Sequence, residues 1–155
     1  VASFLPSNAD VVSSDLSRSI ATADALANGR PRLPHEPNLR EFNFGDWDGK
    51  LWTDVAESNP KLSRDYWAKP GDVIAPNGES WNMAADRVRS VVDRLTAAHT
   101  CIIAVAHFGI ILTQIQRASG ASAYDCLTHK IDNFSVTHLC EENGRWAVNY
   151  INWLP

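Results

Sequence analysis

Hydrophobic and polar positions alternate along the chain with two periods, one typical of strands and one of amphipathic helices. Residues 9–15 predict a short strand that ends in polar residues, and residues 100–106 form a continuous apolar run. A continuous run of this length is typical of a strand that is buried on both faces of a parallel sheet. Residues 133–153 alternate on either side of Glu142, Asn143 and Gly144. That pattern predicts an antiparallel hairpin that turns at these three residues.

Helices are predicted where apolar residues recur every three and four positions. The clearest case begins after Ser80, which caps it, and its apolar positions are Trp81, Ala84, Ala85, Val88, Val91, Val92 and Leu95. Two short helices are expected around 53–58 and 61–68, and another follows His107.

A further helix is predicted from about Leu16 to Asn28. Ser14 or Asp15 is expected to cap its start, and Gly29 to end it. The alternation of strands and helices predicts one α/β domain over residues 1–155. We expect a three-layer α/β/α architecture with a mostly parallel central sheet and an antiparallel C-terminal edge hairpin.

The composition narrows the class of protein. The 155 residues carry a net charge of -4, which gives no reason to expect a nucleic-acid partner. Cys101, Cys126 and Cys140 show no CxxC spacing, which argues against a disulfide framework or a zinc site and fits a reducing compartment. No apolar run approaches the roughly 20 residues that span a bilayer. We expect a cytoplasmic protein with no membrane partner; the sequence does not indicate its oligomeric state.

His107 stands at the carboxyl end of the apolar run 100–106 and is followed by Phe108 and Gly109. One interpretation is a core histidine whose ring nitrogens are satisfied by neighbouring groups. In parallel α/β sheets, however, ligands bind beyond the carboxyl ends of strands. The position is therefore also one where a functional side chain is expected.

Arg18 lies in the first turn of the helix that follows the strand predicted at residues 9–15. Helix N-termini present free N–H groups and partial positive charge, so a cation there is locally unfavourable unless an anion binds. The planar guanidinium donates two parallel hydrogen bonds to phosphate or carboxylate. Two interpretations of Arg18 remain: it binds an anion, or it is an arginine exposed to solvent with no ligand.

Glu41 lies in the segment LREFNFGDWDGK, residues 39–50, among Phe42, Phe44 and Trp47. Apolar surroundings disfavour a charged carboxylate, raise its pKa and suit it to proton donation. The alternative is that Arg40 and Glu41 form an exposed charged pair.

Four stretches in this order resemble the histidine phosphatase superfamily, the phosphoglycerate-mutase-like fold, over about residues 10–153. They are SSDLSRSIATADAL (13–26), LREFNFGDWDG (39–49), PNGES (76–80) and AVAHFG (104–109). The likeness is greater to the small phosphatases, which include α-ribazole phosphatase, than to the classical mutases.

The resemblance implies that a phosphoryl group passes to a histidine and then to water, with no metal ion or other cofactor. It implies that Arg18 clamps phosphoryl oxygens, that Glu41 gives a proton to the leaving group and that His107 stabilises the transferring group. Phe108, Gly109, Ser80 and Glu79 would border the substrate, which we expect to be a small phosphorylated metabolite. Helix capping explains Ser80 equally well.

The chain also departs from the family's pattern. The nucleophilic histidine of the family stands in an Arg-His-Gly motif, which does not occur here. We therefore expect the domain to lack its first strand and helix, roughly 30–40 residues, and to be inactive without them. Phe108 replaces a usual glycine, and Leu112 stands where arginine is frequent. The alternatives are a phosphoglycerate-mutase-type phosphotransferase, or a non-catalytic phospho-ligand binding domain if the natural chain begins at Val1.

Overall fold

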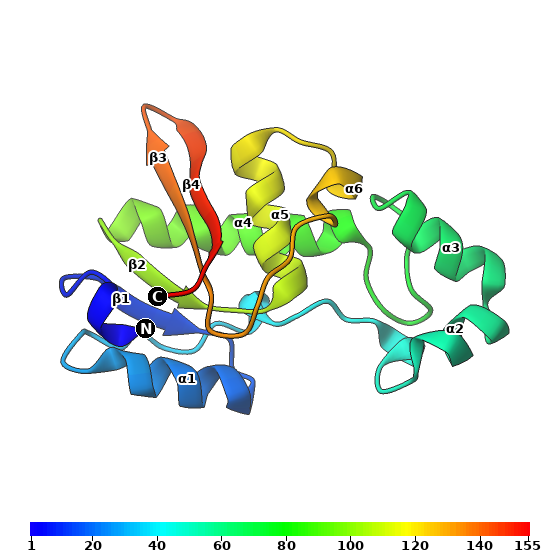
Figure 1. The fold of residues 1–155 in the computed structure, drawn as a ribbon, viewed down its shortest axis with the longest axis horizontal. Coiled ribbons are helices and arrows are strands. Elements are labelled where there is room, and N and C mark those ends of the chain that lie inside the picture. Colours follow the sequence, from blue (N-terminus) through cyan, green and yellow to red (C-terminus); the bar gives the residue numbers. More distant parts are fainter.

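The computed structural model describes residues 1–155 and has a mixed α/β fold with two small sheets (Figure 1). Strands β1 (Asp10–Ser13) and β2 (Ile102–Val105) pair in parallel, and Ser13 lies beside Val105. Because the two strands run in the same direction, their carboxyl ends meet at one edge. The residues that follow β1 and β2 are therefore brought together there.

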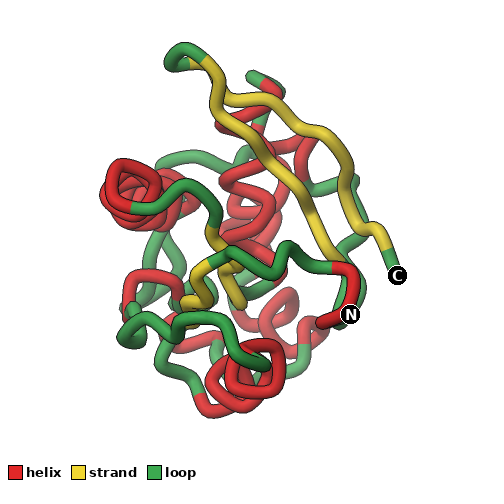
Figure 2. The backbone as a smooth tube through the Cα atoms, turned by 90° about the vertical axis from the view of Figure 1, so that its left-hand side faces the viewer, coloured by secondary structure: helices red, strands yellow, loops and turns green.

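The C-terminal hairpin is confirmed. Strands β3 (Val136–Glu142) and β4 (Arg145–Trp153) pair antiparallel, and Asn143 and Gly144 make the turn with positive φ. These strands pair only with each other, so the hairpin forms a second two-stranded sheet. Figure 2 shows this hairpin running past the helices, with the C-terminus beside the N-terminus. There the ring centroids of Phe4 and Trp153 lie 5.8 Å apart.

The helices cover both faces of the parallel sheet, with α1 on one side and α4 and α5 on the other (Figure 1). Val12 of β1 packs with Val88 and Val91 of α4 and with Ile110 of α5. The helices are α1 (Ser17–Ala27), α2 (Trp52–Ser58), α3 (Pro60–Ala68), α4 (Trp81–Ala98), α5 (Phe108–Ser119) and α6 (Ala123–Cys126), with short 3-10 helices at Ala2–Phe4, Pro37–Leu39 and Gly45–Trp47.

Helices α2 and α3 stand apart from the sheet at the opposite end of the molecule (Figure 1). They have their own small core, in which Trp47, Val55, Tyr66 and Ala75 are buried. Phe44 packs against this core and also against the cluster between α4 and α5. The segment around residues 41–47 thus connects the two parts of the fold.

Two details differ from the sequence predictions. The cap of α1 is Leu16, with no side-chain hydrogen bond. The hydroxyl of Ser14 lies 2.8 Å from His107 Nε2 and accepts from the Leu16 amide only at 3.4 Å, and the carboxylate of Asp15 accepts from Arg40. Strand β2 is not buried on both faces: Ala104 is exposed and the other three residues are half-buried. The reason is that, within these 155 residues, β2 pairs only with β1 and its other edge is open. No helix combines the length and apolar character that crossing a membrane requires.

Candidate active site

The imidazole of His107 is buried, with 8% exposed, yet it is surrounded by side chains with polar groups. His107 follows β2 and caps α5. Its Nε2 lies 2.8 Å from the hydroxyl of Ser14 and 3.2 Å from that of Ser19, and its Nδ1 lies 3.2 Å from Arg18 Nη2. Because a guanidinium can only donate, Nδ1 is the acceptor and the ring proton is assigned to Nε2. Nε2–H then donates to the hydroxyls.

Burial, followed by the positive charges of Arg18 and Arg87, lowers the pKa of His107 to about 4. The imidazole is therefore neutral near pH 7, in agreement with the tautomer that its neighbours require. A bound anion would favour the charged ring and raise this pKa again, since an opposite charge close by stabilises the imidazolium.

Arg18 is exposed in the first turn of α1, and its guanidinium reaches the edge of the His107 ring. That contact is the only side-chain hydrogen bond its guanidinium makes in the 155 residues. Its other N–H groups face no protein acceptor and are available to a ligand. The predicted juxtaposition of Arg18 with His107 is thus present, and it follows from the parallel pairing of β1 with β2.

The carboxyl group of Glu41 lies at the N-terminus of α5. The amide of Gly109 donates to Oε1 at 3.1 Å and to Oε2 at 3.0 Å, and the amide of Phe42 donates to Oε1 at 3.0 Å. Burial raises the pKa of Glu41 despite these N–H groups and the charge of Arg18, which act in the opposite direction. A carboxyl group with a raised pKa can keep a proton and give it to a leaving group.

Gly109 allows this close approach because it has no side chain. A Cβ atom there would lie 2.3 Å from Phe42 Cδ2 and 2.7 Å from Glu41 Oε1. Gly109, which the family resemblance implies borders the substrate, donates its amide hydrogen to Glu41 in this structure. The neighbouring Phe108 is 44% exposed at the start of α5.

Ser80 is buried, and its hydroxyl accepts a hydrogen bond from the amide of Met83 at 3.2 Å. It caps α4, as the pattern predicts. No hydrogen bond joins the Ser80 side chain to Arg18, Glu41 or His107.

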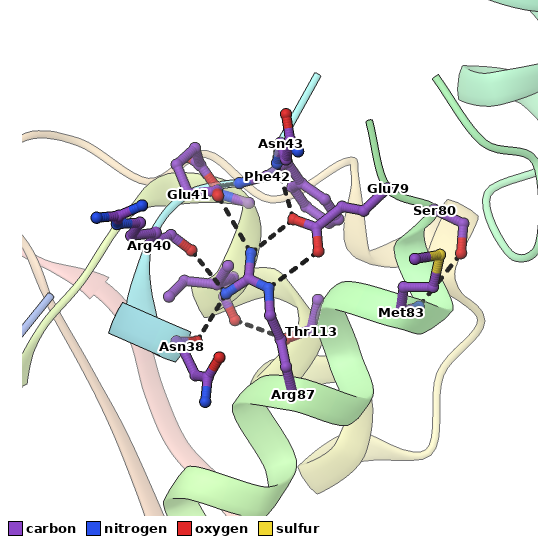
Figure 3. Close-up of polar contacts among 12 residues, drawn as sticks. Asn38, Arg40, Glu41, Phe42, Asn43, Glu79, Ser80, Met83, Arg87 and Thr113 are labelled. Carbon is purple, nitrogen blue, oxygen red and sulfur yellow. Dashed lines mark hydrogen bonds and ion pairs between the residues drawn. The ribbon is translucent and has the colours of Figure 1, made fainter. Parts of the chain in front are cut away.

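Sequence reasoning missed the ion pair between Arg87 and Glu79 beside the site (Figure 3). Arg87 lies three residues after Ala84 and four before Val91, both of which are buried on α4. An arginine on the apolar face of a helix was the available signal, because charged residues are rarely buried unless they are paired.

Together these elements place a guanidinium, an imidazole and a carboxyl group with a raised pKa around the carboxyl end of the parallel sheet. Arg18 contacts His107, and Glu41 contacts Gly109, two positions after His107. The first two groups can bind an anion, and the third can transfer a proton. No three His, Cys, Asp or Glu side chains of the chain gather where they could hold a metal ion.

The chain is similar in sequence and in structure to known phosphatases. The model of the histidine phosphatase superfamily (branch 1) matches residues 3–154. A metal-independent phosphoserine phosphatase of Arabidopsis thaliana is 28% identical over 144 residues, 90% of this chain and 59% of the relative. An adenosylcobalamin/alpha-ribazole phosphatase of Salmonella typhimurium is 26% identical over 88% of this chain.

The chain spans 59% and 64% of the lengths of these two relatives, less than two thirds of each. A mycobacterial glucosyl-3-phosphoglycerate phosphatase has a similar structure, with a TM-score of 0.81 and 25% identity. That similarity covers 94% of this chain and 78% of the mycobacterial one.

Proposed function

The chain belongs to branch 1 of the histidine phosphatase superfamily, and on that premise we propose that the natural protein hydrolyses small phosphate monoesters through a phosphohistidine, with no metal ion. The observation that carries the proposal is the contact of Arg18 with His107 beside the carboxyl group of Glu41. The relatives named as phosphoserine and alpha-ribazole phosphatases support a small phosphorylated metabolite as the substrate.

Arg18 is the proposed clamp for the phosphoryl oxygens. Its free N–H groups stand in the first turn of α1, where the helix adds partial positive charge. When phosphate enters, the guanidinium turns its donors from His107 Nδ1 to the phosphoryl oxygens, because a charged acceptor binds it more strongly than a neutral ring nitrogen.

His107 then becomes a second donor. Its Nδ1, released by Arg18, takes up a proton and donates to a phosphoryl oxygen, while Ser14 and Ser19 continue to accept from Nε2–H. The imidazolium stabilises the negative charge of the transferring group, a preorganised electrostatic effect.

Glu41 supplies the proton. As the bond from phosphorus to the leaving oxygen breaks, the phosphoryl group passes to a histidine nitrogen and Glu41 protonates the leaving oxygen. In the second step a water molecule attacks the phosphohistidine, the Glu41 carboxylate takes the proton of that water, and phosphate is released.

The acceptor histidine of this proposal stands on a strand beside β2, outside the 155 residues. The family's Arg-His-Gly motif does not occur among them. Support comes from β2, whose apolar residues are exposed or half-buried and whose outer edge is unpaired. Such an edge is normally covered in native proteins.

The test is phosphate release by the natural full-length protein in the presence of EDTA, with phosphoserine and p-nitrophenyl phosphate as substrates. We expect both to be hydrolysed and Arg18→Met to abolish most of the activity. Isomerisation of 3-phosphoglycerate without phosphate release would instead identify a mutase. Phosphate binding without turnover of any substrate would identify a non-catalytic binding domain.

A further inference from the structure

The segment that carries Glu41 has almost no regular secondary structure of its own. Residues 40–44 connect two short 3-10 helices, Pro37–Leu39 and Gly45–Trp47. The carbonyl groups of such a segment need partners from elsewhere, because buried polar groups without hydrogen bonds are costly. For three carbonyl groups between residues 38 and 41 the partner is a single side chain, Arg87 of α4.

Figure 3 shows Arg87 reaching from α4 toward this segment. Its Nη1 donates to the carbonyl oxygens of Asn38 at 2.6 Å and Arg40 at 2.9 Å, and its Nη2 donates to that of Glu41 at 3.1 Å. The carbonyls are 46 to 49 positions away in sequence. One guanidinium therefore fixes three points of the backbone around the proposed acid.

Glu79 completes the arrangement. Its carboxylate accepts from Arg87 Nε at 2.9 Å and from Nη2 at 2.6 Å, and it also accepts from the amide of Asn43 at 2.8 Å. The side chain of Arg87 is 20% exposed and that of Glu79 is 10% exposed. All five N–H groups of the arginine thus have acceptors, which an ammonium group with three could not match.

The backbone beyond Asn43 is also held closely. The amide of Glu79 donates to the carbonyl of Asn43, and that of Asp46 donates to the carbonyl of Pro76, both at 2.8 Å. A Cβ atom on Gly78 would lie 2.4 Å from the Asn43 carbonyl oxygen. The segment therefore has little freedom to shift while the pair of Arg87 and Glu79 is intact.

We infer that Arg87 and Glu79 are positioning residues for the proton transfer: they lock the backbone of residues 38–43 so that the Glu41 carboxyl group stays at the N-terminus of α5. This inference rests on the proposed function, because it gives Glu41 the role of acid. The two residues act through the backbone and do not touch the substrate. Loss of the lock lets the carboxyl group leave the Gly109 amide, and a misplacement of about 1 Å can cost about 10²-fold in rate.

The decisive experiment compares Arg87→Lys and Arg87→Met with Glu41→Gln in the natural full-length protein. Phosphoserine has a poor leaving group that needs the acid, and p-nitrophenyl phosphate needs it little. We expect both Arg87 variants to lose kcat on phosphoserine by about 10²-fold and to lose far less on p-nitrophenyl phosphate. In a Glu41→Gln background, Arg87→Met should cost little more on phosphoserine, because the two changes remove the same interaction.

Arg89→Met is the matched control. Arg89 also lies on α4, is half exposed and pairs with Asp86, so its loss removes an arginine without touching the Glu41 segment. We expect wild-type kinetics on both substrates. Circular dichroism and thermal unfolding establish that each variant is folded.

Several outcomes would overturn the positioning role. The first is an equal loss of kcat on both substrates by folded Arg87 variants. The second is a loss of kcat that adds fully to the loss caused by Glu41→Gln. The third is failure of both Arg87 variants to fold, which would indicate a purely structural role for Arg87. Failure of the proposed function is distinct, since the unmutated protein would then release no phosphate. In that case the positioning role is tested by an NMR pH titration of the Glu41 carboxyl carbon in the unmutated protein and in Arg87→Lys. A Glu41 pKa that is the same in both proteins refutes the positioning role, and a lower Glu41 pKa in Arg87→Lys, closer to the ordinary value, supports it.

Discussion

Replacing Gly109 by alanine tests how closely the carboxyl group of Glu41 must approach α5. The new Cβ atom would lie 2.3 and 2.5 Å from two ring carbons of Phe42, and 2.7 Å from Glu41 Oε1. Carbon atoms in contact are ~3.5 Å apart, so the ring must retreat by about 1.2 Å. Phe42 cannot easily do so, because it is buried against Phe44 and Trp81.

Two opposing terms set the effect of Gly109→Ala on stability. Overpacking a core typically costs about 1–3 kcal/mol. Alanine in place of glycine in a helix raises the free energy of unfolding by up to about 1 kcal/mol. We therefore expect the free energy of unfolding to fall by about 0–3 kcal/mol, which leaves a folded protein. The Glu41 carboxyl group, however, is pushed off the Gly109 amide, and hydrolysis of phosphoserine should slow by about 10²-fold.

The assay combines urea denaturation with steady-state kinetics of the natural full-length protein. Gly120→Ala is the control, because Gly120 ends the same helix with φ of 70° and has open space where a Cβ atom would go. The left-handed conformation should cost alanine about 1–2 kcal/mol of stability without affecting the site. A folded Gly109→Ala variant with wild-type rates would refute the close-approach argument.

Three further predictions follow from the site. Glu41→Gln should slow phosphoserine hydrolysis by about 10²–10⁴-fold and p-nitrophenyl phosphate hydrolysis much less, whereas equal losses would remove Glu41 from the acid role. The pKa of His107 is lowered from 6.5 to about 4 in the folded protein, so between these pH values the unfolded chain binds one more proton than the folded one. The free energy of unfolding should therefore fall by about 3 kcal/mol on acidification from pH 6.5 to 4. Urea denaturation of His107→Asn should show a correspondingly weaker pH dependence. Phosphate binding at pH 6 should take up a proton at His107, which calorimetry in buffers of different ionisation enthalpy measures, and Arg18→Met should abolish the heat of binding.

The position of His107 and Arg18 could be predicted because it depends on one rule of sheet topology. Two adjacent parallel strands end at the same edge, so the side chains that follow β1 and β2 meet there. The rule requires only that the strands be recognised. The sequence predicts β2 from a continuous apolar run and β1 from a shorter stretch that ends in polar residues. The cap of α1 was misassigned for a local reason, because the Ser14 hydroxyl has a stronger partner in His107.

The surroundings of Glu41 could not be predicted in the same way. Its amide partner Gly109 is 68 positions away, and the arginine that holds its backbone is 46 away. Neither contact follows from periodicity, because each depends on how α4 and α5 pack around an irregular segment. Burial of β2 was predicted wrongly for a related reason: an apolar run shows that a strand can be covered, but not what covers it.

The charge distribution explains how a chain with a net charge of -4 can offer a phosphate site. The guanidinium of Arg87 is close enough to lower the pKa of His107, but Glu79 compensates its charge and its donors are all occupied. Arg18 has neither a carboxylate partner nor a full set of acceptors, so its charge remains available. His107 is neutral until an anion arrives and then adds the second positive charge. The empty site therefore carries one uncompensated positive charge, that of Arg18, and gains a second as the phosphate binds. Because the imidazole is neutral in the empty site, the cost of burying it next to two arginines is lower.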